Sequence, residues 1–249
     1  MFKRNIRGVS LSNKEKYKAV LFDIDDTLFN SSLMSTSARK NAIRAIRRAG
    51  IEIDEDKGYA ILVKIVKKYG SNYGEHFNRF LEEIGQQPHP KLIAAAVVAY
   101  HSEKHALLRP FPDVVLTLLT LMKELKIGVV SDGIQENQWE KLIYLGFQHF
   151  FETVVINEKK PNQKPGTYGF QKALNELGIA EPVKVIYVGN SIEKDIVGAN
   201  RMGLVSVLYD PKKKADKDKL TGEEKPDYII KRISEITKIV GIKQSKKLM

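Results

Sequence analysis

Two aspartates separated by one residue are the strongest chemical signal in this chain. Asp23 and Asp25 directly follow residues 17–22, a short apolar run bounded by charge that predicts a buried parallel strand. Residues two apart on a strand project to the same side, and open α/β sheets bind ligands at the carboxyl ends of their strands. Two such carboxylates repel unless a cation lies between them or one is protonated. The pair predicts a metal site, an acid/base pair, or both. The alternative is a polar turn with Thr27 as a helix N-cap.

Polar side chains also follow later predicted strands. Ser131, Asp132 and Gly133 follow the second strand, where a hydroxyl and exposed backbone amides can hold a phosphate oxygen. Asn190 and Asp195 straddle the turn after the fourth strand, and their oxygens could meet a hard cation. Each of these signals is weak alone, because the same residues are common in ordinary turns.

A lysine lies between the third strand and the next helix. Lys164 precedes Pro165 at the expected start of that helix, and a cation near the helix N-terminus suits an anionic ligand. The neighbouring pair Lys160 and Pro161 has the same pattern, so the residues alone leave both lysines as candidates.

The elements that must position these residues alternate between helix and strand. Such alternation predicts an α/β fold with a doubly wound parallel sheet. After the first strand, we expect strands at 127–130, 153–156, 183–188, 204–208 and 228–230, and helices at 113–125, 138–145, 167–177 and 192–202, with a short closing helix.

Residues 35–108 have helical periodicity and no convincing strand. Three amphipathic stripes end at Gly50, Gly70 and Gly85, and residues 92–100 form a fourth, more apolar helix. Four helices inserted after a first strand predict a separate helical subdomain.

Composition excludes several classes of protein. The chain of 249 residues has no cysteine, which excludes disulfides, thiol catalysis and zinc–thiolate sites and fits a reducing cytoplasm. No apolar run approaches the roughly 18 residues that span a bilayer. The polar, basic stretch 1–18 does not resemble a secretory signal.

The net charge of +11 invites comparison with nucleic-acid-binding proteins. Its lysines are scattered and lack interleaved aromatic residues, so we expect solvated charge and no nucleic-acid partner. Abundant Lys and Glu without Cys also fits a thermophilic protein.

The ordered motifs resemble those of the haloacid dehalogenase-like (HAD) superfamily of hydrolases. The resemblance covers residues 17–240. It implies a Rossmann-like core formed by residues 1–30 and 110–249, and a helical cap at 31–109. Within the superfamily the chain resembles archaeal phosphatases assigned to glyceraldehyde 3-phosphate, through residues 70–74, 107–110, 132–133 and 138–142.

The resemblance also implies roles. Asp23 is the nucleophile, Asp25 the general acid/base, and Ser131 and Lys164 cradle the phosphate. It favours Lys164 over Lys160, because Lys164 is six residues after Glu158 and six before Phe170. A Mg²⁺ cofactor would be held by Asp23, the backbone carbonyl of Asp25, and the fourth motif. The remaining candidates for metal binding are Asn190 and Asp195, and those for substrate contact are Thr27, Asp132, Gly133, Asn72 and Tyr73.

One residue departs from the family pattern. Asn190 stands where the family usually has a metal-binding Asp, and an amide supplies a dipole where a carboxylate supplies charge. We predict a Mg²⁺-dependent phosphomonoesterase of a small phosphorylated metabolite, with glyceraldehyde 3-phosphate as a candidate, acting through an aspartyl-phosphate. A 2-haloacid dehalogenase and an impaired, ligand-binding homologue are the alternatives. A monomer and a homodimer both remain open.

Overall fold

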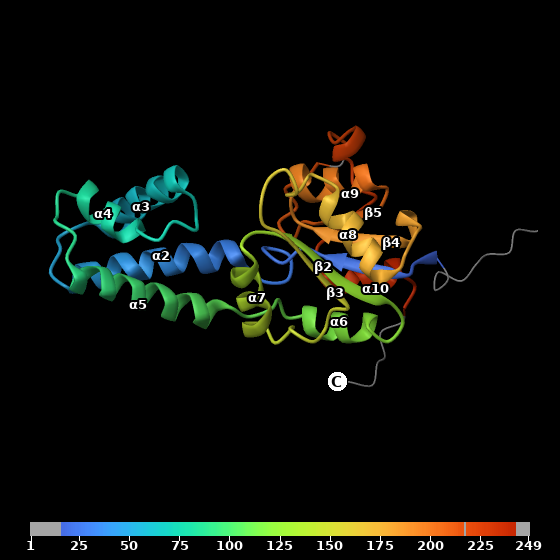
Figure 1. Cartoon of the computed structure of the whole chain (residues 1–249), viewed down its shortest axis with the longest axis horizontal. Coiled ribbons are helices and arrows are strands. Elements are labelled where there is room, and N and C mark those ends of the chain that lie inside the picture. The colour runs from blue at the N-terminus through green and yellow to red at the C-terminus, as the bar shows by residue number, and fades with distance from the viewer. Residues whose placement is uncertain (1–15, 217, 243–249) are drawn as a thin grey trace, which may run out of the picture. The chain divides into compact units, whose positions relative to one another are not determined.

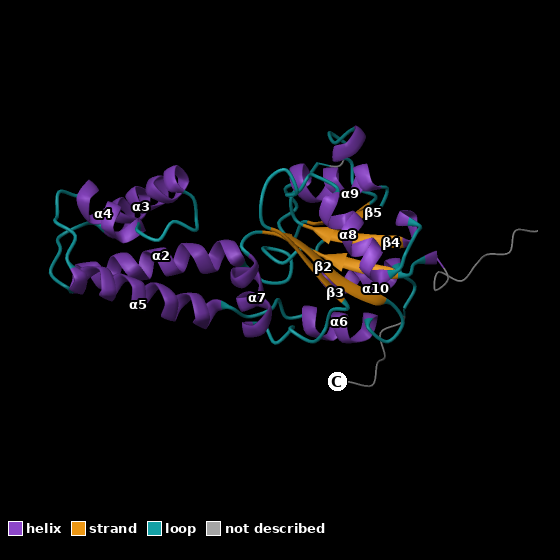
Figure 2. Ribbon diagram, viewed as in Figure 1, coloured by secondary structure: helices purple, strands orange, loops and turns teal. Residues whose placement is uncertain are grey.

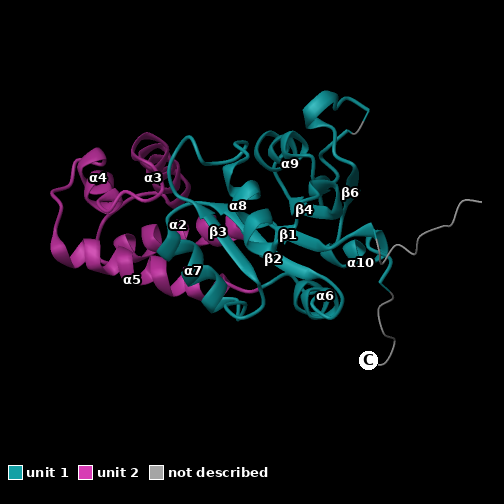
Figure 3. Cartoon of the chain, turned by 45° about the vertical axis from the view of Figure 1, so that its right-hand side comes forward, with its two compact units in different colours: residues 1–29, 110–249 teal, residues 30–109 magenta. Residues whose placement is uncertain are grey.

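The computed structural model describes residues 16–216 and 218–242. The chain divides into two compact units, one formed by Met1–Phe29 and Pro110–Met249 and the other by Asn30–Arg109 (Figure 3). Most of the N-terminal stretch in which we found no secretory signal lies outside the described residues. Among the described helices, none is both long and apolar enough to cross a membrane.

The first unit is built on a six-stranded parallel sheet with strand order β3-β2-β1-β4-β5-β6. The central strand β1 consists of four fully buried apolar residues, so it reads as a continuous hydrophobic run. The strands are β1 (Ala19–Phe22), β2 (Lys126–Asp132), β3 (Thr153–Asn157), β4 (Val185–Gly189), β5 (Val205–Tyr209) and β6 (Tyr228–Ile230).

Helices cover both faces of this sheet. Figures 1 and 2 show α8 and α9 above the strands and α6 below them. Helix α8 packs against β2 and β3, and α6 packs against α10. The helices are α6 (Val114–Leu121), α7 (Gln135–Tyr144), α8 (Tyr168–Leu177), α9 (Val197–Met202) and α10 (Ile236–Ile239).

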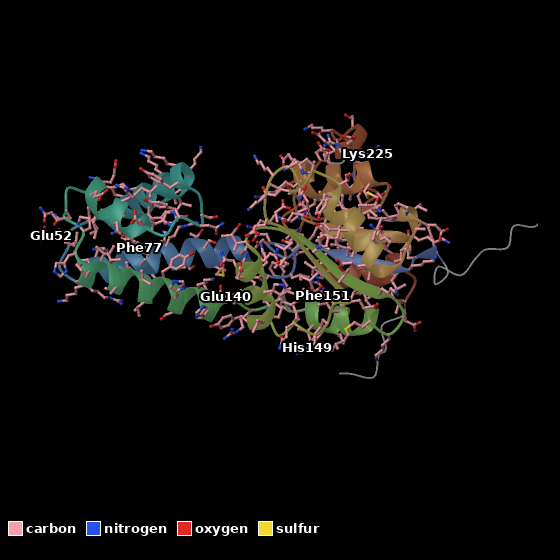
Figure 4. The ribbon with its side chains drawn as sticks, in the orientation of Figure 1. Glu52, Phe77, Glu140, His149, Phe151 and Lys225 are labelled. Carbon is pink, nitrogen blue, oxygen red and sulfur yellow. The ribbon has the colours of Figure 1, made fainter. Side chains whose placement is uncertain are left out.

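The second unit contains only helices, namely α2 (Ser31–Arg48), α3 (Glu55–Tyr69), α4 (His76–Glu83) and α5 (Pro90–Leu107). Asn30 and Asp54 cap the first two with side-chain oxygens that accept from backbone amides. Phe77, labelled in Figure 4, packs edge-on against Tyr100 with ring centroids 6.2 Å apart. The unit therefore has an apolar core of its own.

The doubly wound α/β prediction is confirmed, while some element boundaries differ. Strand β2 continues through Ser131 and Asp132, and α8 begins at Tyr168, one residue after the start of its expected range and three residues after Pro165. The helix expected at 192–202 is a π-helical segment, Ile192–Ile196, followed by α9. A π-helical turn is a local feature that hydrophobic periodicity does not reveal.

Candidate active site

The polar residues at the carboxyl ends of β1, β2 and β4 converge at one edge of the sheet. Phe22, the last residue of β1, lies opposite Val129 of β2 and Val188 of β4, so the residues after β1 lie alongside the last residues of the other two strands. The Asp23 amide continues the ladder by donating to the Val188 carbonyl at 2.9 Å. Parallel register therefore places residues more than a hundred positions apart in one site.

The Asp23 carboxylate is held by one of its two oxygens. Oδ1 accepts from Ser131 Oγ and from Lys164 Nζ, both at 2.8 Å, whereas Oδ2 accepts no hydrogen bond from the described residues. The pKa of Asp23 is raised to about 6, because burial and the nearby Asp195 and Asp25 carboxylates together outweigh the opposing charge of Lys164. One oriented oxygen and one uncommitted oxygen suit a carboxylate nucleophile.

Lys164 is the centre of a buried polar network. Its ammonium lies 2.6 Å from Asp195 Oδ1 and 2.9 Å from the Tyr187 hydroxyl, in addition to its bond with Asp23. Burial alone disfavours the charged ammonium, but the carboxylates of Asp195 and Asp23 hold its pKa well above the ordinary value. Lys164 is thus a fixed cation beside the candidate nucleophile.

Tyr187 is a site residue that the sequence analysis missed. Its hydroxyl donates to the Val130 carbonyl at 2.9 Å and lies 3.0 Å from Asp195 Oδ1. Its position in the apolar strand β4 could have indicated a polar role, because a buried phenol needs a hydrogen-bond partner.

The hydrogen bonds of Asp195 favour a different role from the metal ligand expected. Oδ1 accepts from Lys164 and lies 3.0 Å from the Tyr187 hydroxyl, and Oδ2 accepts from the backbone amides of Asn190 and Ser191 at 3.0 and 2.9 Å. Both oxygens of the carboxylate are therefore already engaged within the protein. The geometry supports Asp195 as the residue that positions Lys164 and the turn after β4.

The Asp25 carboxylate is bound from helix α7. Lys141 Nζ lies 2.8 Å from Oδ1 and 2.6 Å from Oδ2, and Gln138 Nε2 donates to Oδ2 at 3.1 Å. Neither α7 residue was predicted as part of the site. Their spacing in the sequence could have indicated that they face the protein interior, because Gln138 and Lys141 lie on the same helix face as the fully buried Leu142.

Asp132 and Gly133 make contacts within the protein. The Asp132 carboxylate accepts from the Lys164 backbone amide at 3.1 Å and from Asn157 Nδ2 at 3.1 Å. The Gly133 amide donates to the Asn157 carbonyl at 3.2 Å. Both were predicted to contact substrate, whereas these bonds favour a role in holding the loop that carries Lys164.

Thr27 is fully buried, and its hydroxyl donates to Asn190 Oδ1 over a long 3.4 Å. Because the Thr27 side chain is buried away from solvent, its hydrogen bond favours a role in orienting Asn190 over the predicted contact with substrate.

Asn72 and Tyr73 lie in the loop between α3 and α4 of the helical unit. The Tyr73 ring stacks on Tyr69 at 4.8 Å between centroids, and its hydroxyl donates to Glu75 and accepts from Arg79. Their predicted contact with substrate stays a prediction.

Comparison with known proteins identifies the family of this chain. The sequence profile of the haloacid dehalogenase-like hydrolase family matches residues 20–209. The chain belongs to this family. It is 47% identical over 226 residues to the glyceraldehyde 3-phosphate phosphatase of Methanopyrus kandleri, covering 90% of this chain and 97% of that protein. The phosphatase of the same name from Methanothermobacter thermautotrophicus is 38% identical, with 93% and 99% covered.

The fold is likewise that of known HAD structures. YfnB of Bacillus subtilis, described as a HAD-hydrolase bound to magnesium, aligns with a TM-score of 0.64 at 18% identity and covers 91% of this chain and all of YfnB. The predicted superfamily is therefore confirmed, and the names of the relatives bear out the prediction of a HAD-type phosphatase.

The residues at this HAD site fit a hard cation in part. The Asp23 carboxylate and Asn190 Oδ1 are oxygen donors of the kind Mg²⁺ prefers. Among the described residues, no cluster of three or more His, Asp and Glu side chains could hold a metal. A magnesium site here would therefore depend on an amide and a backbone carbonyl as well as on Asp23.

We predict that Gly189→Ala disrupts the Lys164 network. An added Cβ at residue 189 would lie 2.5 Å from Asp195 Cβ, so the Asp195 side chain must move away from Lys164. Overpacking of this kind typically costs about 1–3 kcal/mol, and we expect activity to fall by about tenfold or more. Thermal unfolding and steady-state kinetics measure both effects.

Gly74→Ala is the matched control for stability, because its added Cβ meets no atom within 4 Å and its φ is not positive. Wild-type stability and activity in Gly189→Ala would contradict the crowding at Asp195.

We predict that Asp23→Asn abolishes turnover while leaving the fold intact. The amide is isosteric with the carboxylate but far less nucleophilic, so activity should fall below about one hundredth of the wild-type value. Residual activity above that level would contradict the assignment of Asp23 as nucleophile.

The same variant tests the electrostatics of Asp23. A raised pKa means that the folded protein loses its proton less readily than the unfolded chain, so the wild type loses stability as pH rises from about 4 to about 6. Asn does not ionise. With a chelator present, the melting temperature of Asp23→Asn minus that of the wild type should therefore increase between about pH 4 and pH 6. A difference that stays constant over this range would contradict the raised pKa of Asp23.

Proposed function

We propose that this protein is a Mg²⁺-dependent phosphomonoesterase that forms a phosphoryl intermediate on Asp23. The observation that carries the proposal is the state of the Asp23 carboxylate, with Oδ1 fixed by Ser131 and Lys164 and Oδ2 uncommitted. An anionic nucleophile that attacks an anionic phosphate needs its charge offset, and Lys164 provides a fixed positive charge.

The residues of the site support a two-step reaction. In the first step an Asp23 oxygen bonds to phosphorus, the bond from phosphorus to the leaving oxygen breaks, and Asp25 donates a proton to the released alcohol. In the second step Asp25 takes a proton from water as the water oxygen bonds to phosphorus and the bond to Asp23 breaks. Alcohol and phosphate are the products, and both aspartates return to their starting states.

Bound Mg²⁺ would neutralise charge on the transferring phosphoryl group. In this proposal Asp23, the backbone carbonyl of Asp25 and Asn190 hold the ion, while Asp195 supports the site from behind Lys164. The magnesium described for YfnB and the donor chemistry of these residues support the choice of metal.

The proposed substrate is a small phosphorylated metabolite. Glyceraldehyde 3-phosphate is the first candidate, because the relatives at 47% and 38% identity are named for it. We propose that residues 31–109 act as a cap that contributes Asn72 and Tyr73 to substrate recognition. A cytoplasmic location is part of the same proposal and fits the cysteine-free sequence.

Hydrolysis of p-nitrophenyl phosphate with and without Mg²⁺ tests the reaction, and a panel of phosphorylated metabolites tests the substrate. Turnover that requires Mg²⁺ supports the proposal. Absence of phosphatase activity with every substrate in saturating Mg²⁺ would refute it, and release of halide from a 2-haloacid would favour a dehalogenase.

We predict that Asp25→Asn slows hydrolysis most for substrates with poor leaving groups. A sugar alcohol needs a proton as it departs, whereas p-nitrophenolate needs little help, so the loss of kcat should be larger for a sugar phosphate. Steady-state kinetics with both substrates measure the ratio. Equal losses would contradict the role of Asp25 as the acid.

We predict that Asn190→Asp tightens Mg²⁺ binding and raises activity at limiting metal. A carboxylate adds a negative charge beside the ion, and hard divalent cations bind mainly through such charge. Titration of activity against Mg²⁺ should show a lower half-saturating concentration, and calorimetry of metal binding gives an independent value. Superimposable titrations would mean that residue 190 does not limit metal affinity.

A further inference from the structure

Helix α7 makes a contact with the candidate acid/base that the proposed mechanism does not use. Lys141 Nζ lies within hydrogen-bond distance of both oxygens of Asp25, at 2.6 and 2.8 Å. The Lys141 side chain is 15% exposed and the Asp25 side chain 33% exposed, so the ion pair is partly shielded from water. Charge-assisted bonds of this length and burial are stronger than an ordinary surface ion pair.

Helix α7, which carries Lys141, is hydrogen-bonded to the site through Gln138. Gln138 is 3% exposed, and its Nε2 donates both to the Asp132 carbonyl at 2.7 Å and to Asp25 Oδ2. Gly133 has φ 142° and no side chain, and an added Cβ there would lie 2.8 Å from Gln138 Nε2. The absence of a side chain at Gly133 therefore leaves the space in which Gln138 contacts Asp25.

The two oxygens of Asp25 are held unequally. Oδ2 accepts from both Lys141 and Gln138, whereas Oδ1 accepts only from Lys141 among the described residues. A carboxylate anchored through one oxygen keeps its direction while the other oxygen exchanges a proton. Lys141, with several rotatable bonds and one partner residue, can release Oδ1 without releasing Oδ2.

We infer that Lys141 is a positioning residue that, with Gln138, anchors Asp25 through Oδ2 and leaves Oδ1 to exchange the proton. This inference rests on the proposed function. Asp25 Oδ1 gives its proton to the leaving alcohol in the first step and takes one from water in the second, while Oδ2 stays bound to α7. Alternatively, Lys141 could bind an anionic part of the substrate directly, and the experiment below distinguishes the two roles.

The experiment compares Lys141→Met with wild type in saturating Mg²⁺, using a sugar phosphate and p-nitrophenyl phosphate. Loss of the anchor leaves the phosphate-binding groups in place, so we expect kcat for the sugar phosphate to fall about 10- to 100-fold with KM within about threefold of wild type. The loss should be smaller for p-nitrophenyl phosphate. Lys141→Arg, which can donate two hydrogen bonds to a carboxylate, should recover part of kcat.

A double variant tests whether the effect of Lys141 on catalysis depends on Asp25. If Lys141 acts only on that carboxylate, adding Lys141→Met to Asp25→Asn should cause no further loss, because the two changes remove the same interaction. Lys172→Met is the control for removing a helix lysine, since Lys172 of α8 is 50% exposed and pairs only loosely with Glu176 at 3.9 Å. It should behave as wild type. Lys141→Gln replaces the methionine variant if the latter does not fold.

Three results would overturn the inference. A raised KM with unchanged kcat would assign Lys141 to substrate binding, additive losses in the double variant would show an action independent of Asp25, and wild-type kinetics would show that the ion pair is dispensable. An inactive wild-type enzyme would refute the proposed function itself, which separates that failure from the other three.

Discussion

A buried lysine between two carboxylates is the constraint on which the site depends. The Lys164 side chain is 3% exposed, and its ammonium bonds to Asp23 and Asp195. Removing one partner of a buried ion pair typically costs about 3–5 kcal/mol, because the remaining charge keeps its desolvation penalty. The fold can keep this lysine charged only if β1, β4 and the loop before α8 meet within hydrogen-bond distance. The stability of the fold and the proposed chemistry therefore both require that these three segments meet around Lys164.

Local backbone features follow from that requirement. Gly189 leaves the space that the Asp195 side chain occupies, and the π-helical segment carries Asp195 back towards the end of β4. The other oxygen of Asp195 binds the amides of Asn190 and Ser191. One carboxylate thus positions both the fixed cation and the turn that presents Asn190, so a change at residue 195 would disturb charge and backbone together.

The sequence predicted most of the fold and only part of the site. Apolar strands and glycine-terminated helices have strong periodicity, and the motif residues lie directly after predicted strands, so their meeting at one sheet edge followed from topology. Periodicity does not reveal a π-helical turn, and the role of Asp195 depends on that turn. Lys141 and Gln138 are over a hundred residues from Asp25, and only the packing of α7 brings them to it.

The two lysines of the site differ in a way that matches the groups they bind. Lys164 has two carboxylate partners and a tyrosine hydroxyl, so moving it would leave several buried groups unpaired. Lys141 contacts one carboxylate and is more exposed. A nucleophile benefits from a constant electrostatic environment, whereas an acid/base must change its protonation state twice in each turnover. A fixed cation beside Asp23 and a more adaptable one beside Asp25 meet these two demands separately.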